Sequence, residues 1–348
     1  MPCGVQILVI NPGSTSTKLG WFEGDRPVEI RSLDHTGEAW LSADDEVQIR
    51  HRIKRVWEFA GDRKPDLIMA RGGLLKPLPS GVYVINRKML EDLKRSPYKH
   101  ASNLAAPIAY DMARKFGVTA YIADPVTVDE MRDIARYAGH PFFVRRSIFH
   151  ALNQKATARR HAEATGAVYE DLNLIVIHMG GGISVGAHCK GRVVDVNQAL
   201  DGEGPFSPQR SGTLPSGDLV RAAFSGKFTQ TELLHMITGE GGLQAYTGSA
   251  DMKKLEQSGD VETQRVIEAM IYGIAKYAGE MAVVLRGEID AILLTGGLAY
   301  SERVTKKLKE YLSFLAPVFV YPGENELEAL AYNGYLVWKG KLKAFDYK

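Results

Sequence analysis

The stretch VINPGSTSTKLGWF, residues 9–22, decides how the rest of the chain is interpreted. An apolar run ends at Asn11, six small or polar residues follow at 12–17, and a second apolar run begins after Lys18. A hairpin between two strands needs only two to five connecting residues. The additional residues supply hydroxyl groups, backbone amides and one cation, which are the groups that bind phosphate. The sequence therefore predicts a phosphate-binding hairpin.

Composition and charge limit the class of protein. A chain of 348 residues is long for one hydrophobic core, so two domains are expected. Its 45% hydrophobic and 24% charged residues are typical of a globular protein. The net charge of +2, with no strongly basic block, argues against nucleic acid as a partner.

Cysteine usage and hydropathy indicate where the protein works. Two cysteines, Cys3 and Cys189, are too few for a disulfide framework, which favours a reducing compartment. The N-terminus has no signal-peptide pattern. The most apolar helical candidate, 265–285, contains Glu268, Lys276 and Glu280 and cannot be a membrane span. We therefore expect a cytoplasmic protein with no membrane partner.

The opening pattern recurs about half a chain later. LNLIVIHMGGGISVGAHCKGRVVDV, residues 172–196, contains an apolar strand, a three-glycine turn, a second strand, a Lys-Gly turn and a third strand. A third glycine turn lies in DAILLTGGLAYSERV, 290–304, where Ser301 is a plausible helix N-cap. Helical periodicity is found between these turns, at 44–60, 101–116, 128–138, 148–165 and 261–285. Two α/β domains with a cleft between them are expected.

The common nucleotide-binding signatures are missing from the sequence. It has no G-x-x-x-x-G-K-[ST], no G-x-G-x-x-G after a strand, and no protein-kinase set. Paired glycine hairpins in duplicated halves are another solution, because glycine lets backbone N–H groups approach phosphate closely.

Seven stretches, in order along nearly the whole chain, carry a family resemblance: VINPGSTSTKLGWFE, ARGGLLKPLPSGVYVIN, ADPVTVDEM, RRSIFHALNQKA, HMGGGISVGAHCKGRVVDVNQALDGEGPFSPQRSGTLPSGDLV, DAILLTGGLAYS and APVFVYPGENELEAL. The sequence resembles the acetokinase family of short-chain acyl kinases, within the superfamily of acetate and sugar kinases, heat-shock chaperones and actin. NPGSTSTK and ARGG stand where acetate kinases usually carry N-A-G-S-S-S-x-K and H-R-x-x-H-G-G, so the chain is nearer the butyrate type.

The resemblance implies an α/β fold of two duplicated ribonuclease-H-like (actin-type) domains with a nucleotide cleft between them. Residues 1–155, joined by the C-terminal helix at about 326–348, are expected to form the first domain and 156–325 the second. The implied reaction is reversible, ATP-dependent phosphorylation of butyrate to butyryl phosphate by direct in-line transfer. ATP/ADP and Mg²⁺ are the implied cofactors, and a homodimer or larger homo-oligomer is the implied assembly.

This chemistry needs cations more than it needs a base. The acceptor carboxylate is already an anion, and two unit charges about 4 Å apart repel by roughly 4 kcal/mol at an effective dielectric near 20. Arg71 follows an apolar strand and precedes two glycines, and Arg210 lies in an irregular loop. A single arginine is usually only a surface charge. The resemblance, however, matches these two to arginines that hold the substrate carboxylate and the transferring phosphoryl group.

The remaining roles also come from the resemblance. His150 contacts the phosphoryl group, Phe149 lines the acyl pocket, Asp124 orients metal and nucleophile, and Asn11 touches the phosphoryl group or a metal-bound water. Without the resemblance, His150 would be read as a packed core histidine and Asp124 as a turn former. Ser14, Ser16 and Lys18 complete the first phosphate loop. The nucleotide-binding residues of the second half are His178, Gly180, Gly181, Gly182, Gly296 and Gly297.

The metal is expected to have few protein ligands, because Mg²⁺ keeps water and phosphate in its shell. In PGENEL an ungapped alignment puts Asn325 at the family's acidic position. Glu326 is therefore only a weak metal candidate beside Asp124, and an acid in the first turn of a helix is the alternative.

Two alternative functions stay open. The substrate could be another short-chain acid, namely acetate, propionate, isobutyrate or isovalerate, because one methylene changes binding by only about 1–3 kcal/mol. The more remote alternative is a non-enzymatic, actin- or chaperone-like ATPase, which has no need for Arg71, His150 and Arg210 together.

Overall fold

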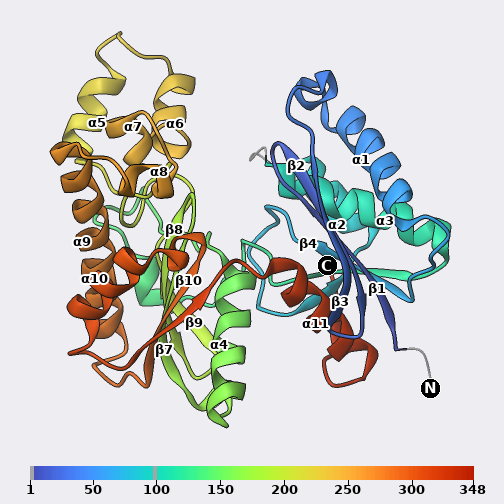
Figure 1. The fold of residues 1–348 in the computed structure, drawn as a ribbon. Coiled ribbons are helices and arrows are strands. Elements are labelled where there is room, and N and C mark those ends of the chain that lie inside the picture. The colour runs from blue at the N-terminus through green and yellow to red at the C-terminus, as the bar shows by residue number, and fades with distance from the viewer. Residues whose placement is uncertain (1–3, 97–99) are drawn as a thin grey trace. The chain divides into compact units, whose positions relative to one another are not determined.

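The computed structural model describes residues 4–96 and 100–348. Contacts divide the chain into two compact units, one of Met1–Val128 with Asn325–Lys348 and one of Asp129–Glu324 (Figure 1). The boundary expected at residue 155 falls inside helix α4 (Ala151–Thr165), and 129–155 pack with the second unit. Each unit is described by itself below.

The first unit is built on a seven-stranded mixed sheet. Its spatial order is β12-β5-β6-β4-β1-β2-β3. Strands β1 and β2 and strands β2 and β3 pair antiparallel, whereas β1, β4 and β6 are parallel neighbours. The strands are β1 (Gln6–Pro12), β2 (Ser16–Glu23), β3 (Arg26–Asp34), β4 (Leu67–Arg71), β5 (Val82–Val84), β6 (Thr119–Ala123) and β12 (Ala344–Asp346).

Helices cover both faces of this sheet because its central strands are apolar on both sides. Ile68 and Ala70 of β4 pack in one cluster with α1 (Asp45–Ala60) and α3 (Ala105–Phe116). Leu67 and Met69 point the other way and contact Gly334 of α11 (Glu326–Trp338), where a Cβ atom would lie 2.8 Å from the Met69 side chain. The C-terminal helix is therefore part of the first unit. The remaining helix of this unit is α2 (Arg87–Lys94).

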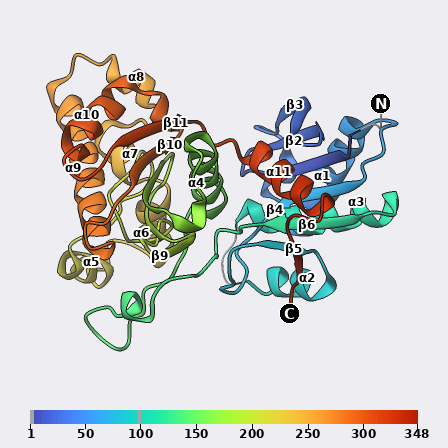
Figure 2. The same cartoon turned by 90° about the horizontal axis from the view of Figure 1, so that it is seen from below.

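The second unit has a five-stranded sheet in the order β11-β10-β7-β8-β9. Its strands are β7 (Asn173–Met179), β8 (Ile183–Cys189), β9 (Arg192–Val196), β10 (Ala291–Gly296) and β11 (Val318–Pro322). Helix α4 covers one face, and α9 (Val261–Val284) and α10 (Glu302–Leu312) cover the other (Figure 2). Four short helices lie between β9 and α9: α5 (Ser216–Ala223), α6 (Gln230–Thr238), α7 (Gly242–Thr247) and α8 (Met252–Glu256).

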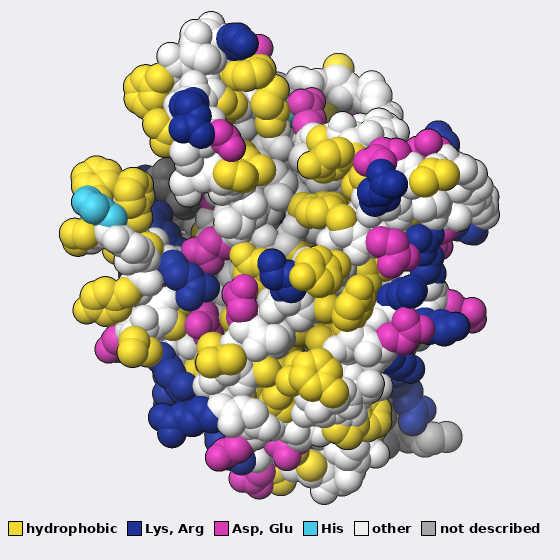
Figure 3. Space-filling view, turned by 90° about the vertical axis from the view of Figure 1, so that its left-hand side faces the viewer, with side chains coloured by type: hydrophobic (Ala, Val, Ile, Leu, Met, Phe, Trp, Pro, Cys, Tyr) yellow, Lys and Arg dark blue, Asp and Glu magenta, His cyan; other side chains and the backbone are white. Residues whose placement is uncertain are grey.

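The outer side of α9 and α10 is not uniformly polar. Tyr272 and Val283 of α9 and Phe314, which follows α10, are exposed, at 53%, 78% and 82%. Hydrophobic side chains lie among charged ones of both signs on this face (Figure 3). Among the residues that the structure describes, no helix is both long and apolar enough to cross a membrane.

The internal repeat predicted from the sequence is confirmed. Strands β7 and β8 begin 167 residues after β1 and β2, at 173 against 6 and at 183 against 16. In each unit the first three strands of the sheet form an antiparallel meander, and helices and parallel strands follow it along the chain. The α/β class with two duplicated halves is therefore confirmed.

Two local predictions differ from the structure. The six-residue loop at 12–17 is shorter than expected, because Pro12 pairs with Thr17 in the strand ladder and only 13–15 connect the strands. The helix expected at 128–138 is wrong. Only a 3₁₀ turn at Asp133–Arg136 forms, Tyr137 pairs with Val144 in an isolated bridge, and Tyr137 is 82% exposed. An amphipathic pattern does not make a helix when no core lies beneath its apolar side.

Candidate functional site

Three predicted residues of the first unit lie at the same edge of its sheet. Asn11 and Arg71 lie near the carboxyl ends of β1 and β4, and Asp124 directly follows β6. The three strands are parallel neighbours, with Ile10 beside Ala70 and Arg71 beside Ala123. The carboxyl ends of parallel strands are where ligands bind in open α/β sheets.

Asn11, Arg71 and Glu326 form a connected polar group. The Asn11 amide nitrogen donates to Glu326 Oε2 at 2.7 Å, and Arg71 Nη2 lies 3.2 Å from Glu326 Oε1. Asn11 is 3% exposed and Glu326 is 9% exposed. Within the described part of the chain, the buried Asn11 Oδ1 has no hydrogen-bond partner. Such an oxygen is costly unless a ligand or water reaches it.

The carboxylate that contacts Asn11 and Arg71 belongs to Glu326, one residue after Asn325. Asn325 takes the left-handed conformation at φ 45°, which asparagine tolerates, and is exposed without capping the helix. The next residue begins α11 and turns its carboxylate to Asn11 and Arg71.

Asp124 has a local structural task. Its Oδ1 accepts hydrogen bonds from Ser80 Oγ at 2.6 Å and from the Gly81 amide at 2.9 Å, and its own amide donates to the Gly81 carbonyl. The residue is 2% exposed and has φ 38°. Asp124 therefore fixes the turn before β5 next to the strand ends.

The predicted phosphate hairpin connects β1 and β2. The Gly13 amide donates to the Ser16 carbonyl at 2.8 Å and closes the turn. Ser14 is exposed and Ser16 is half-buried, and Lys18 pairs across the ladder with Asn11. Asn11 and Lys18 thus lie on the two strands of the hairpin, next to its turn.

Two histidines form the centre of the predicted site in the second unit. His150 precedes α4 and His178 lies near the end of β7, and their rings stack with centroids 3.8 Å apart and planes 12° apart. His150 Nδ1 lies 2.9 Å from Ser184 Oγ, and His178 Nδ1 lies 2.7 Å from Asn153 Oδ1. Phe149 is 2% exposed.

The hydrogen-bond network assigns the tautomers of both rings. The Asn153 amide nitrogen donates to the Glu324 carbonyl at 2.6 Å, so its oxygen faces His178 and accepts from the Nδ1–H group. Ser184 Oγ accepts from Gln154 Nε2 at 2.8 Å and from the His150 amide at 3.5 Å. Its proton therefore goes to His150 Nδ1, which leaves the Nε2–H group of that ring as a donor.

The glycine turn 180–182 lets neighbouring side chains lie directly against its backbone. The Gly180 amide donates to the Gly182 carbonyl at 3.0 Å. A Cβ atom on Gly182 would lie 2.2 Å from Arg210 Nη1, and one on Gly181 would lie 2.5 Å from Gln209 Oε1. Arg210 also donates to the Ala199 carbonyl. The structure thus places Arg210 directly on the second predicted phosphate turn.

The last predicted turn follows β10. Gly296 has φ 88°, and a Cβ atom there would lie 2.4 Å from the Met179 carbonyl oxygen. Gly297 begins a 3₁₀ turn and faces open space. The close approach of β10 to the end of β7 therefore requires glycine at position 296.

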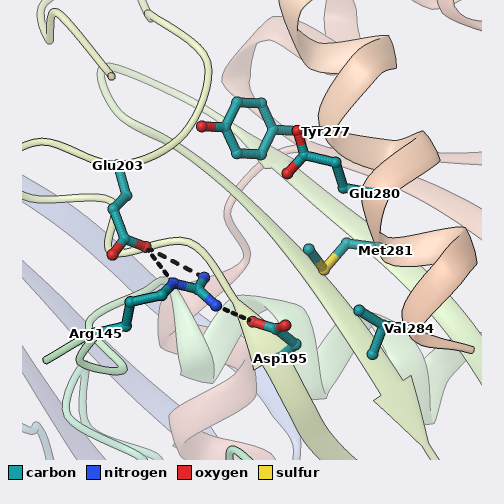
Figure 4. Close-up of a pocket in the computed structure, with 7 residues that line it drawn as sticks. All are labelled: Arg145, Asp195, Glu203, Tyr277, Glu280, Met281 and Val284. Atoms are coloured by element: carbon teal, nitrogen blue, oxygen red, sulfur yellow. Dashed lines mark hydrogen bonds and ion pairs between the residues drawn. The ribbon is translucent and has the colours of Figure 1, made fainter. Parts of the chain in front are cut away.

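A pocket of about 270 Å³ lies elsewhere in the second unit, and no residue predicted for the site lines it (Figure 4). Arg145 lies 3.1 Å from Asp195 and 3.3 Å from Glu203 and donates to two backbone carbonyls. Burial raises the pKa of Asp195 and of Glu280. These contacts are those of a structural ion-pair network that connects the segment before α4 to β9.

Several residues of the two half-sites were not predicted. Glu326 was a weak candidate, and Ser80, Asn153 and Ser184 were not considered. They act by holding other side chains, and short polar residues in a strand or helix give no sequence signal for this. Within the described ranges, no group of three or more His, Cys, Asp or Glu side chains is spaced to hold a metal ion.

Comparison with solved structures defines the class of fold. The chain is similar to Porphyromonas gingivalis acetate kinase, with a TM-score of 0.78 and 17% identity over 96% of this chain and 100% of that chain. A propionate kinase from Francisella tularensis gives a TM-score of 0.73 and 19% identity over 94% and 98%. At these identities the similarity shows the fold.

Sequence relatives identify the family. The model of the acetokinase family matches residues 131–318. Butyrate kinase 2 of Clostridium acetobutylicum is 48% identical over 99% of both chains, and butyrate kinase 1 of the same organism is 47% identical over 99% of both. A probable butyrate kinase of Phocaeicola vulgatus is 46% identical over 99% of both chains. The chain belongs to the acetokinase family.

Proposed function

We propose that this protein is a butyrate kinase, which transfers the γ-phosphoryl group of ATP reversibly to the carboxylate of butyrate. The observation that carries the proposal is the 46–48% identity, over 99% of each chain, to proteins named as butyrate kinases. The geometry of both units agrees with phosphoryl transfer to an acceptor that needs no deprotonation.

In the first unit, Arg71 receives the substrate carboxylate. The ion pair with Glu326 holds the guanidinium group in place, and the rest of its fork remains for an anion, because guanidinium has five N–H donors. The hairpin residues Ser14, Ser16 and Lys18 bind the transferring phosphoryl group. Asp124 acts through the turn that it fixes beside Arg71.

In the second unit, the turns at 180–182 and 296–297 bind the phosphates and the nucleoside of ATP or ADP. Arg210 lies on the first of these turns. His150 donates its Nε2–H group to the phosphoryl group during transfer, which the ring can do whether it is neutral or protonated. His178 supports His150 by stacking. Phe149 borders the acyl chain.

Mg²⁺ fits the residues at the edge of the first sheet. The buried Asn11 Oδ1 lacks a partner among the described residues, and the Glu326 carboxylate lies beside it. Oxygen atoms of this kind are what Mg²⁺ binds directly or through water. Bound there with the phosphates, the ion would neutralise charge on the transferring group. Glu326 and Asn11 would hold its water shell, and Asp124 is the second acidic candidate.

The acid specificity is tested by trapping the acyl phosphate as its hydroxamate, with Mg-ATP and a panel from acetate to isovalerate. We expect the highest kcat/KM with butyrate. A preference for acetate, propionate, isobutyrate or isovalerate would keep the acyl kinase and replace the substrate. ATP hydrolysis without a product from any acid would instead favour the actin- and chaperone-like alternative.

A cytoplasmic homodimer or larger homo-oligomer is part of the same proposal. The exposed apolar side chains on α9 and just after α10 support self-association, and the low cysteine content supports a reducing compartment. Light scattering at several protein concentrations measures the assembly, and a strictly monomeric mass would contradict it.

A further inference from the structure

A buried arginine lies behind the hairpin of the first unit. Arg52 of α1 is 0% exposed. Its two terminal nitrogens donate to the carbonyls of Ser16 at 2.8 Å and Gly13 at 2.9 Å, and to the Thr17 hydroxyl. A longer contact of 3.5 Å reaches the Ser14 carbonyl. The Arg52 guanidinium thus binds the carbonyl of Gly13, where the turn begins, and that of Ser16, directly after the turn.

The charge of Arg52 has no acidic partner in the described part of the chain. The hydrogen bonds that its side chain donates to the described residues end on carbonyl or hydroxyl oxygens, and its Nε atom has no hydrogen-bond partner among them. Burial lowers the pKa of Arg52 to about 10, so the group is a cation at neutral pH. A buried, unpaired cation is unusual, because removing charge from water is expensive unless it is compensated.

The surroundings of Arg52 also accommodate a positive charge without neutralising it. The guanidinium lies over the Trp40 ring at 5.5 Å, a cation–π contact. The Thr17 hydroxyl accepts from Arg52 and lies 2.8 Å from His35 Nε2, with which it shares a hydrogen bond. Burial, and secondarily Arg52, lowers the pKa of His35, which keeps that ring neutral. The residues packed around Arg52 thus preserve its charge.

The position of the charge indicates its counter-ion. A peptide carbonyl and the amide that follows it point in opposite directions. Because the Arg52 guanidinium binds the carbonyls of the turn, the amides that follow those carbonyls face away from Arg52. We propose that Arg52 is a positioning residue of the phosphate hairpin, whose unpaired charge is compensated by the terminal phosphate of bound ATP. This rests on the proposed function, since that function makes the hairpin a phosphate site.

The test measures nucleotide binding to the full chain by calorimetry, with Mg-ATP and with AMP. In Arg52→Met we expect the Kd of ATP to rise about tenfold or more, whereas the Kd of AMP, which lacks the terminal phosphate, stays within twofold. KM for ATP should rise and KM for the acid should not. Arg55→Met is the matched control, because Arg55 lies one turn along α1 and pairs with Glu38 and Glu58 at the surface.

Each outcome decides the proposal. Equal losses for ATP and AMP, or a lower melting temperature with unchanged stabilisation by ATP, would show a purely structural role and overturn it. If Arg52→Met does not fold, Arg52→Lys keeps the charge but not the fork, and an intermediate, ATP-selective loss is expected; wild-type affinity would overturn the proposal. If the wild-type chain itself binds no ATP, the proposed function fails instead.

Discussion

At the scale of single residues, the candidate site of each unit contains one arginine, and the two arginines are held by different partners. Arg71 is held by the Glu326 carboxylate, and Arg210 by a backbone carbonyl and by contact with a glycine turn. Both arginines are half-buried. Charge stabilisation in such a site is stronger than at an open surface because less water screens it.

We predict that Arg71→Ala and Arg210→Ala each lower kcat/KM by about a hundredfold or more, since losing one preorganised transition-state contact costs this much in other enzymes. Acyl-phosphate formation is the measurement, and circular dichroism should show an intact fold. Arg265→Ala is the control, because Arg265 lies exposed on α9 and pairs with Glu262. Near-normal rates in either site variant would contradict the charge-based mechanism.

The residue scale is also where prediction from sequence reached its limit. Asn11 and Arg71 could be predicted as candidates because strand ends and a family motif mark them. Arg52 could not, because it looks like any other basic residue of the amphipathic helix α1, and its burial follows only from how that helix packs behind the hairpin. Ser184 and Asn153 were not predicted either, because their contacts with the two histidines also depend on how the elements pack.

At the scale of elements, the glycine turns were predictable, and only the length of the first one was not. Alternating apolar runs and glycines indicated both meanders. In the structure, three residues connect the first two strands of each meander, namely 13–15 in the first unit and 180–182 in the second. The helix predicted at 128–138 does not form. Arg136 instead pairs with Asp129 at 2.6 Å, and Tyr137 forms an isolated bridge with Val144. Contacts within the loop itself replaced the helical pattern there.

The turn after β10 gives a prediction at this scale. Gly296→Ala should lower the melting temperature strongly, because its Cβ atom would lie 2.4 Å from a backbone oxygen of β7 and its φ is 88°. Gly297→Ala should leave the melting temperature nearly unchanged, since open space surrounds that position. Thermal unfolding of the two neighbouring variants measures the difference. Equal melting temperatures would show that β7 and β10 can separate without cost.

At the scale of the whole molecule, buried histidines set how stability depends on pH. Burial holds the pKa of His188 well below its usual 6.5, and it also lowers the pKa of His35 and of His161. His188 is 0% exposed, contacts Gln154 Oε1 and accepts from the Tyr169 hydroxyl. Below pH 6.5 the unfolded chain binds protons at these positions that the folded chain does not.

Stability is therefore complete above pH 6.5 and falls as the pH decreases, by about 1.4 kcal/mol per pH unit for a histidine that stays neutral in the fold. Asp195 and Glu280 act in the opposite sense, since burial raises their pKa values from 3.8 and 4.5 and stability is lost as pH rises through them. These two carboxyls oppose the three histidines wherever the two pH ranges overlap.

We predict a melting temperature that falls from pH 7.5 to 5.5, and a smaller fall in His188→Gln. Glutamine has both a donor and an acceptor for the neighbours of His188 but takes up no proton in this range. Thermal unfolding in buffers of equal ionic strength measures both chains. A wild-type melting temperature independent of pH in this interval would mean that His188 becomes protonated inside the fold. The hydrogen bond between the Tyr169 hydroxyl and His188 Nδ1 would then run in the reverse direction, because both nitrogens of a protonated ring donate.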